Sequence, residues 1–348
     1  MEKEALEVID SPENAIHLTY ELPRFWKRVF ANFLDIVFLV LAFITVFIAV
    51  QKTAEATPQY QRADAIISRT RSDSQIFRYA SSRKTWENIS TYLDNNNDVS
   101  YSTRVYICEV AIDDFITFIQ NNCTTEQYES VVKDYKDCRL SERTVDSGNR
   151  HLFITSIVDG EEKIIKNPDA VAGSQYYYEH FYREYTLVNC GGFLVSFFPN
   201  YRNALQTQSN ILFFIQIPIT LFVSSFIVYY LPGLIFRRGR PTFGKKILSI
   251  GTVDSNVVSP KFGRYTAKFA IFFFGEIVLS LFTFGVPLII SFSMMAFTKR
   301  KTGFPDFMLG LTEVDTIRQK IYFSKYEVSL DHSPDHKDPI DFKMVNKE

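Results

Sequence analysis

Charged residues inside apolar runs are the residues of this chain whose chemistry is most informative. Asp35 is the only charged residue from Val29 to Val50, and Arg28 immediately precedes that run. Glu276 is the only charged residue from Phe269 to Phe297. A charge at the centre of a bilayer costs about 2.5–3.5 kcal/mol on insertion scales, so it is retained where a partner or a function compensates. Such carboxylates bind cations, relay protons or hold helices together.

Arg28 and Asp35 are seven residues apart. A helix places them on one face, about 20° apart around the axis and roughly 10 Å apart along it. This distance is long for a direct ion pair, and Asn32 could bridge the row between them. The three polar residues Arg28, Asn32 and Asp35 on one helix face predict one of two roles. They form either a polar seam that binds a cation or relays protons, or a structural clamp that fixes helix packing. If Glu276 met Asp35, the two carboxylates would form a proton or sodium site.

The elements that carry these residues are apolar runs, although the 22% of charged residues and the net charge of -1 are typical of a soluble chain. The runs Val29–Val50 and Ile211–Phe236 each exceed the roughly 20 residues that cross a hydrocarbon core. They predict transmembrane helices over 24–51 and 210–236. The residues before the first run lack the features of a cleavable signal peptide, so we expect this helix to remain as an anchor.

The third apolar run is too long for one straight span. Its 29 residues, Phe269–Phe297, would extend roughly 43 Å as a helix, whereas the hydrocarbon core is about 30 Å thick. Gly285 and Pro287 lie near its centre, where a break is easiest. Both flanks are basic, so we predict a helical hairpin over 265–298; one tilted span with the C-terminal tail outside is the alternative.

Basic residues near the helix ends predict the orientation. Arg24 and Lys27 precede the first helix, and Arg237, Arg238 and Arg240 follow the second. The positive-inside rule places both ends in the cytoplasm. We therefore expect a multi-pass protein of the cell membrane with cytoplasmic termini. Segments 1–23, 237–264 and 299–348 would lie inside, and residues 52–209 would form an extracytoplasmic domain.

All four cysteines lie in the segment 52–209, at Cys108, Cys123, Cys138 and Cys190. Disulfides persist in oxidising compartments, so this clustering predicts one or two disulfides without selecting a pairing. Buried free thiols are the alternative. The cysteine spacings do not fit a zinc site, and we expect no metal.

The segment 52–209 is expected to be an α+β domain inserted into an all-α transmembrane core of two spans plus the hairpin. Its start, residues 53–92, is polar and predicts helix, whereas Arg104–Ala111 is typical of a strand or of a helix start. Thr124 and Gln127 can form a capping box for a helix that ends near Lys136. Alternating apolar residues on either side of 159–160 predict a β-hairpin. No combination of nucleophile and base suggests catalysis there.

Three separated stretches share a known pattern. Arg28 and Asp35 have the spacing R-x6-D with Ala31 between them. The segment 239–248 contains Thr242, Gly244 and Lys245 in the order T-x-G-K, and Arg264 follows it. Asp306-Phe-Met-Leu-Gly310-Leu-Thr312 has the form D-x-x-x-G-x-T.

In these stretches the chain resembles the RDD family of small bacterial membrane proteins, which is named for one arginine and two aspartates. Two departures are Pro305, where a histidine commonly precedes the second aspartate, and the large segment 52–209, which is not part of the family core. The resemblance implies a multi-pass membrane protein for which transport or ion exchange is the usual proposal. Because Asp306 lies just beyond the basic cluster at 299–301, we expect it to pair with Arg28 or Arg264 at the cytoplasmic face, either as a gate or as a structural latch.

The segment 239–246 also comes within one residue of a Walker A loop. Lys246 occupies the position where Ser or Thr would bind Mg²⁺, and a membrane helix rather than a strand precedes the loop. We therefore expect no nucleotide binding. Instead, we expect a tight cytoplasmic turn followed by an amphipathic stretch from Lys245 to Lys268 whose basic residues contact anionic head groups.

Two functional hypotheses follow. The first is a transporter or cation/proton exchanger that uses Asp35, with Arg28 and Glu276. The second is a non-enzymatic membrane scaffold or envelope sensor whose outer domain binds a ligand or partner. We expect no enzyme activity, cofactor or nucleic acid, and as partners the lipid bilayer and either a second copy or another membrane protein. The charged tail from Thr316 is expected to be largely disordered.

Overall fold

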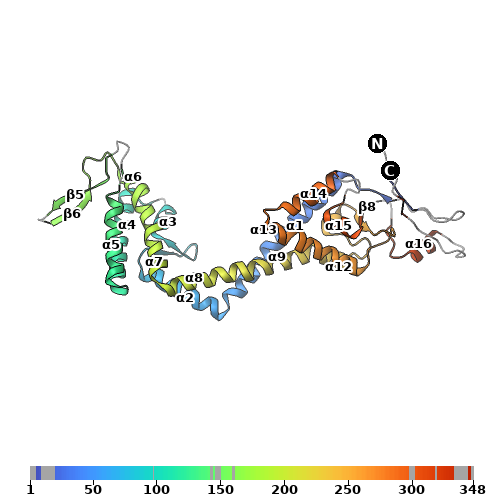
Figure 1. Ribbon diagram of the computed structural model, residues 1–348, viewed down its shortest axis with the longest axis horizontal. Coiled ribbons are helices and arrows are strands. Elements are labelled where there is room, and N and C mark those ends of the chain that lie inside the picture. The colour runs from blue at the N-terminus through green and yellow to red at the C-terminus, as the bar shows by residue number, and fades with distance from the viewer. Residues whose placement is uncertain are drawn as a thin grey trace. The chain divides into compact units, whose positions relative to one another are not determined.

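The computed structural model describes residues 5–8, 20–96, 98–141, 144–145, 150–158, 161–297, 302–317, 320–332 and 344–345. The chain is mostly helical and forms two compact units. We call Met1–Lys52 with Ile215–Glu348 the membrane unit, and Thr53–Phe214 the insert unit. Figure 1 shows the helices and short strands of both units along the chain.

Three helices of the described chain are long and apolar enough to cross a membrane. The first is α1, Phe25–Glu55, in which only 6% of the most apolar window is buried inside the protein. An apolar surface that the protein itself leaves uncovered is expected where lipid is the solvent. The other two helices are Pro199–Ile235 and Phe262–Phe282.

Both of these helices contain wide π-helical turns. The second helix is built from α8 Pro199–Asn210, η3 Ile211–Gln216, α9 Ile217–Ser225, η4 Phe226–Tyr230 and α10 Leu231–Ile235. The third helix is built from α12 Phe262–Ala270, η5 Ile271–Val278 and α13 Leu279–Phe282. Pro218 is the second residue after the η3 turn, and a proline removes one backbone hydrogen bond from a helix. A widened turn is a common adjustment to such an interruption.

The third helix ends in a sharp turn, and the chain then folds back. Phe284 and Gly285 have positive φ values of 51° and 86°. The following helix α14, Val286–Phe297, packs against η5. The run Phe269–Phe297 is therefore broken beside Gly285 and forms two packed arms. At about 1.5 Å per residue, the 12 residues of α14 extend roughly 18 Å, which is less than the thickness of a hydrocarbon core.

Short elements at one end of the helices complete the membrane unit. They are β1 Ala5–Val8, β2 Tyr20–Glu21, α11 Phe243–Ile247, β7 Ile250–Val253, α15 Phe304–Leu309, β8 Thr312–Asp315, α16 Lys325–His332 and β9 Met344–Val345. Strand β7 pairs with β8 in antiparallel fashion, and all four residues of β7 are buried. A second sheet has the order β2-β1-β9.

The segment after β8 is more ordered than its composition predicts. Ile321 and Tyr322 are buried, and the carbonyl of Tyr322 accepts a hydrogen bond from the Ser259 amide at 2.7 Å. Val328 of α16 is fully buried. The expectation of a disordered tail is therefore wrong for residues 320–332, because a few apolar side chains attach this segment to the β7 region. Residues 333–343 lie outside the described part of the chain.

In its described residues, the insert unit is mostly helical and contains two separate two-stranded hairpins. Its elements before α8 are α2 Pro58–Asp73, β3 Phe77–Ala80, β4 Thr85–Asn88, α3 Ile89–Asp94, α4 Tyr101–Asn122, α5 Thr125–Arg139, β5 Phe153–Val158, β6 Glu161–Lys166, α6 Ser174–Tyr177, η1 Tyr178–Tyr182, η2 Tyr185–Cys190 and α7 Gly191–Phe197. The capping box of Thr124 and Gln127 is confirmed at the start of α5. The pairing of Val158 with Glu161 confirms the predicted hairpin, although residues 159–160 themselves are outside the described chain.

One alternative for the insert unit is confirmed, and one expectation needs correction. The segment 104–111 lies near the start of helix α4, Tyr101–Asn122, so the helix alternative is confirmed and the strand alternative is wrong. The segment 53–92 is helical only in part, because the hairpin β3–β4 follows α2. Short-range patterns could not separate strand from helix here, since both types of element bury an apolar face.

Buried tyrosines hold the centre of the insert unit. Tyr178 and Tyr182 are at most 1% exposed, yet each hydroxyl has a carboxylate acceptor. Tyr178 donates to Asp94 Oδ1 at 2.8 Å, and Tyr182 donates to Glu109 Oε1 at 2.5 Å. A buried tyrosine whose hydroxyl is satisfied contributes its large apolar ring without an unpaired polar group. The tyrosine-rich segment 176–185 is therefore a core element.

The four cysteines are free thiols, so the predicted disulfides are not found. Cys108 and Cys190 are fully buried in the insert core. Burial raises the pKa of the Cys108 thiol to about 12. The Cys138 thiol donates to Asp134 at 3.8 Å. The alternative interpretation, buried free thiols, is therefore confirmed for Cys108 and Cys190, which act as small core residues, whereas Cys123 and Cys138 are free thiols that are only partly buried.

Candidate functional site

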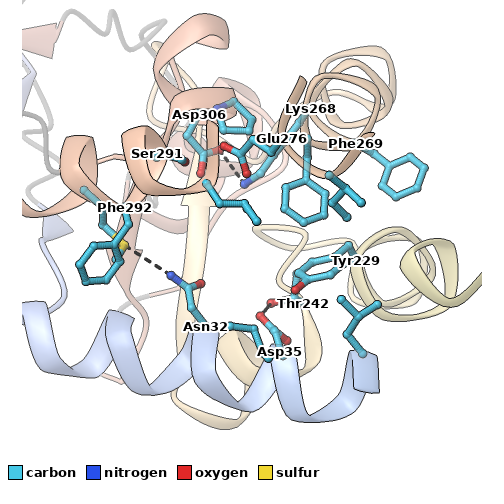
Figure 2. A pocket seen from close by; sticks show the side chains of 18 of the residues that line it. Asn32, Asp35, Tyr229, Thr242, Lys268, Phe269, Glu276, Ser291, Phe292 and Asp306 are labelled. Atoms are coloured by element: carbon cyan, nitrogen blue, oxygen red, sulfur yellow. Dashed lines mark hydrogen bonds and ion pairs between the residues drawn. The ribbon is translucent and has the colours of Figure 1, made fainter. Parts of the chain in front are cut away.

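Asp35 attaches the loop after the second helix to α1. It is 1% exposed and uses both carboxylate oxygens. Oδ2 accepts a hydrogen bond from the Thr242 hydroxyl at 2.5 Å, and Oδ1 accepts one from the Gly244 amide at 2.7 Å. Figure 2 shows Thr242 pointing at Asp35. The cost of burying this charge is therefore offset by two charge-assisted hydrogen bonds.

Gly244 is required by the close contact between this loop and α1. A Cβ atom at this position would lie 2.2 Å from the carbonyl oxygen of Ala31 and 3.0 Å from Asp35 Oδ1. Ala31 itself is fully buried. The small residues at positions 31 and 244 thus let the Gly244 amide reach the aspartate. This contact gives the T-x-G-K stretch a structural explanation.

Lys245, the next residue, forms a buried ion pair. Its Nζ lies 2.5 Å from Glu313 Oε1 on strand β8, and their side chains are 12% and 6% exposed. Burial alone would lower the pKa of Lys245 and raise that of Glu313, but their mutual attraction reverses both shifts. The positive charge of Arg28, which is 2% exposed, also helps to lower the pKa of Glu313. The expectation that Lys245 contacts lipid head groups is therefore wrong.

Asp306 pairs with a residue that the sequence pattern did not select. Lys268 Nζ lies 2.6 Å from Asp306 Oδ1, whereas Arg264 pairs with Asp254 at 3.2 Å. The predicted pairing of Asp306 with Arg264 is wrong, because Arg264 lies opposite the turn that carries Asp254. Lys268 lies on α12 and was visible in the sequence only as a basic residue before an apolar run.

Asn32 contacts a different helix rather than bridging the row on α1. Its side-chain amide donates to the sulfur of Met295 on α14 at 3.4 Å. Nearby, Lys27 forms a 2.5 Å ion pair with Asp315 of β8. The polar face of α1 is thus attached to α14 and to the β7–β8 pair. Sequence reasoning missed Glu313 and Asp315. Their one signal was position, since they lie one and three residues after the D-x-x-x-G-x-T stretch.

A cavity of about 750 Å³ lies among α1, η4, the η5 helix and α14. Asp35, Glu276 and Asp306 all line it. In Figure 2, Asp35 lies on the α1 side of the cavity, and Glu276 lies across from it beside Asp306 and Lys268. The two intramembrane carboxylates therefore share one cavity, but each has its own neighbours.

Glu276 is the carboxylate of this cavity that has an oxygen with neither a hydrogen bond nor an ion pair among the described residues, since the equally unbonded Asp306 Oδ1 pairs with Lys268. Glu276 is 4% exposed, and its Oε1 has no hydrogen-bond partner among the described residues. The Ser291 hydroxyl, which interacts with the carboxyl group, also accepts the Phe304 amide at 3.0 Å. An under-satisfied acceptor in a cavity is a place where a proton or a cation can bind.

These observations define the chain as a multi-pass α-helical membrane protein with a polar cluster inside its helix bundle. Residues 185–310, about a third of the chain, match the model of the RDD family, and the chain thus carries an RDD family domain. The match includes the T-x-G-K loop and Asp306, whereas Arg28 and Asp35 precede it. No curated protein and no solved structure matches the chain.

Proposed function

We propose that this protein is a membrane transporter that exchanges a cation for a proton at Glu276. The observation that supports the proposal is the unused carboxylate oxygen of Glu276, which is buried and lines the cavity. A proton and a cation compete for one carboxylate, so an alternating occupancy of this group couples their movements. Ionisable residues inside membrane bundles commonly mark such pathways.

The neighbouring charges favour Glu276 over the other carboxylates. Asp306 is neutralised by Lys268, and Glu313 is neutralised by Lys245. Asp35 is held by two hydrogen-bond donors from the loop. These three groups have structural partners that a transported ion would have to displace, whereas Glu276 offers a free oxygen.

This assignment changes the role that the sequence suggested for Asp35. The spacing of Arg28 and Asp35 left an ion site and a structural clamp equally open. The contacts of Asp35 with Thr242 and Gly244 favour the clamp. In the proposal, Asp35 therefore positions the loop, and Glu276 exchanges the proton.

Flux measurements on the purified full-length protein test the proposal. In proteoliposomes with an internal pH-sensitive dye, gradients of sodium, potassium and tetraethylammonium are applied in turn, and at least one of them is expected to drive proton movement. Glu276→Gln should reduce this flux at least about tenfold, because an amide cannot exchange a proton at the operating pH. Asp35→Asn is the matched carboxylate control and should keep most of the flux, since an asparagine still accepts the Gly244 amide.

Loss of flux in Asp35→Asn with unchanged flux in Glu276→Gln would contradict the assignment. No flux in the unmodified protein under any of these gradients would contradict cation exchange. The melting temperature of each variant shows whether a lost flux reflects lost folding. We further propose that both termini are cytoplasmic and that copies associate to complete the transport path, with no catalytic reaction in either unit.

A second candidate function rests on the insert unit. This unit has its own core, in which Phe115, Ile119 and Leu152 are fully buried. A separate core of this kind suits a domain that binds a ligand or partner outside the membrane while the membrane unit anchors it. Cross-linking in cells tests this alternative: a partner captured by the full chain should be lost when residues 60–200 are deleted, and a partner that is retained would exclude it.

A further inference from the structure

The cavity around Glu276 is lined mainly by hydrocarbon. Apolar side chains come from α12, η5 and α14, namely Phe269, Phe272, Leu288, Ile289 and Phe292. Its volume of about 750 Å³ falls in the range of roughly 300–1,000 Å³ that is typical of sites for organic molecules. Figure 2 shows Phe269 and Phe292 on the same side of α1 as Glu276, around the charged cluster. The cavity is therefore both larger and more apolar than a site for a bare inorganic ion requires.

The described charged residues that line the cavity leave one negative charge uncompensated. The acids are Asp35, Glu276, Asp306 and Glu313, and the bases are Arg240, Lys245 and Lys268. Lys268 and Lys245 each form an ion pair with one acid, as described above. Arg240 instead donates to the carbonyls of Pro260 and Gly233, at 2.8 and 3.2 Å. Among the described residues, Asp35 and Glu276 are therefore the two carboxylates of the lining without an ion pair. Since Asp35 already accepts hydrogen bonds from Thr242 and Gly244, Glu276 is the carboxylate that a bound cation would neutralise.

Aromatic rings in the lining of the cavity also favour a cationic ligand. The rings of Tyr229 and Phe272 both line the cavity, with centroids 4.4 Å apart. Aromatic faces attract organic cations, and this attraction is larger when the cation is removed from water. By contrast, a small hydrated metal ion would need several oxygen ligands to replace its water. The hydrocarbon lining favours a ligand that carries its own apolar groups.

From these observations we infer that the cavity binds an amphipathic organic monocation, with its positive centre at Glu276 and its apolar groups among Phe269, Phe272 and Phe292. This inference rests on the proposed exchange function and names the class of its substrate. Because the proton and the organic cation share one carboxylate, protonation of Glu276 releases the cation.

Tetraphenylphosphonium and tetraphenylborate provide a direct test, since they are a cation and an anion of nearly the same size and shape. Binding of each is measured by equilibrium dialysis against the full-length protein in nanodiscs, and binding to empty nanodiscs is subtracted. We expect saturable binding of the cation and none of the anion. Lowering the pH should weaken binding of the cation.

Two pairs of variants locate the site. Glu276→Gln should weaken binding of the cation at least about tenfold and remove its pH dependence, whereas Glu276→Asp retains the charge and should retain binding. Phe272→Ala should weaken binding several-fold. Phe274→Ala is the matched control, because Phe274 is on the same helix, is 64% exposed and does not line the cavity.

Several outcomes would overturn the inference. These are equal saturable binding of the anion, binding of the cation that Glu276→Gln does not change, and no saturable binding of the cation to a protein that still exchanges sodium or potassium for protons. In the last case the proposed exchange would stand, and only the substrate class would be wrong. Conversely, binding of the cation without flux under any gradient would refute transport and leave the binding site intact.

Discussion

At the scale of residues, the contact between Asp35 and the loop that carries Thr242 and Gly244 depends on small side chains at the contact. The Gly244 amide reaches Asp35 because Gly244 has no Cβ and because Ala31 has only one side-chain carbon. The Thr242 hydroxyl satisfies the second oxygen. The charge on Asp35 is thus kept inside a helix bundle by two donors that come from a loop more than 200 residues away in the sequence.

Gly244→Ala is expected to destabilise the protein by about 1–3 kcal/mol, because the new methyl group would lie 2.2 Å from the Ala31 carbonyl oxygen. Thermal unfolding in detergent measures the effect. Gly263→Ala is the matched control, since a Cβ atom there has nothing within 4 Å. Equal melting temperatures for the two variants would show that the contact between the loop and α1 is looser than described.

At the scale of elements, the β7–β8 pair positions charged side chains beneath the helices. Thr252 of β7 is paired with Glu313 of β8, and this register points the Glu313 side chain at Lys245. Asp315, two residues further along β8 and so on the same face, pairs with Lys27 of α1. The strand therefore connects the first helix with the loop after the second helix.

Breaking the buried Lys245–Glu313 pair should cost much more than breaking an exposed one. Lys245→Met leaves the Glu313 charge buried and is expected to cost about 3–5 kcal/mol, whereas the double variant with Glu313→Leu should recover most of the loss. Arg69→Met is the control, because Arg69 and Asp73 form a pair whose side chains are 86% and 51% exposed. Such pairs contribute about 0–1 kcal/mol. A small cost for Lys245→Met would contradict the buried pairing.

The same pair predicts a pH dependence of stability. The folded pKa of Glu313 is lower than its ordinary value of 4.5, so its contribution is complete above that pH and is lost as the pH falls through the folded pKa. The folded pKa of Lys245 is higher than its ordinary value of 10.5, so its contribution is complete below that pH and is lost as the pH rises further. The coupling energy from a double-mutant cycle should be constant between these two values and decrease in acid.

At the scale of the whole molecule, the chain combines an RDD domain with a separate insert unit that interrupts the membrane unit between residues 52 and 215. The insert unit has a tyrosine-rich core and free thiols.

Thiol labelling tests the proposed orientation of the two units. Cys123 is partly exposed, so a membrane-impermeant maleimide added to intact cells should label it if the insert unit lies outside. Burial raises the pKa of this thiol, so labelling should be slower than for a fully exposed cysteine. In a variant with the native cysteines replaced, Tyr326→Cys, at a position that is 72% exposed, should be labelled only after permeabilisation. The reverse pattern would invert the topology.

The sequence by itself determined the features that depend on neighbours along the chain. Apolar runs identified the membrane helices, Thr124 and Gln127 identified a helix start, and the three short stretches identified the RDD domain. Helices and hairpins in these segments form through hydrogen bonds and side-chain patterns among residues close together in the sequence. A short stretch of the sequence is therefore enough to predict them.

Only the tertiary structure decided which charges meet. Asp35 could have been an ion site, but its two donors lie in the loop after the second helix. Lys268 rather than Arg264 pairs with Asp306, and Glu276 remains with an unused oxygen. These outcomes depend on how segments from distant parts of the sequence pack. A buried charge pairs with the few groups that lie within hydrogen-bond distance of it after folding. The number of residues between two groups in the sequence does not give the distance between them in the folded protein.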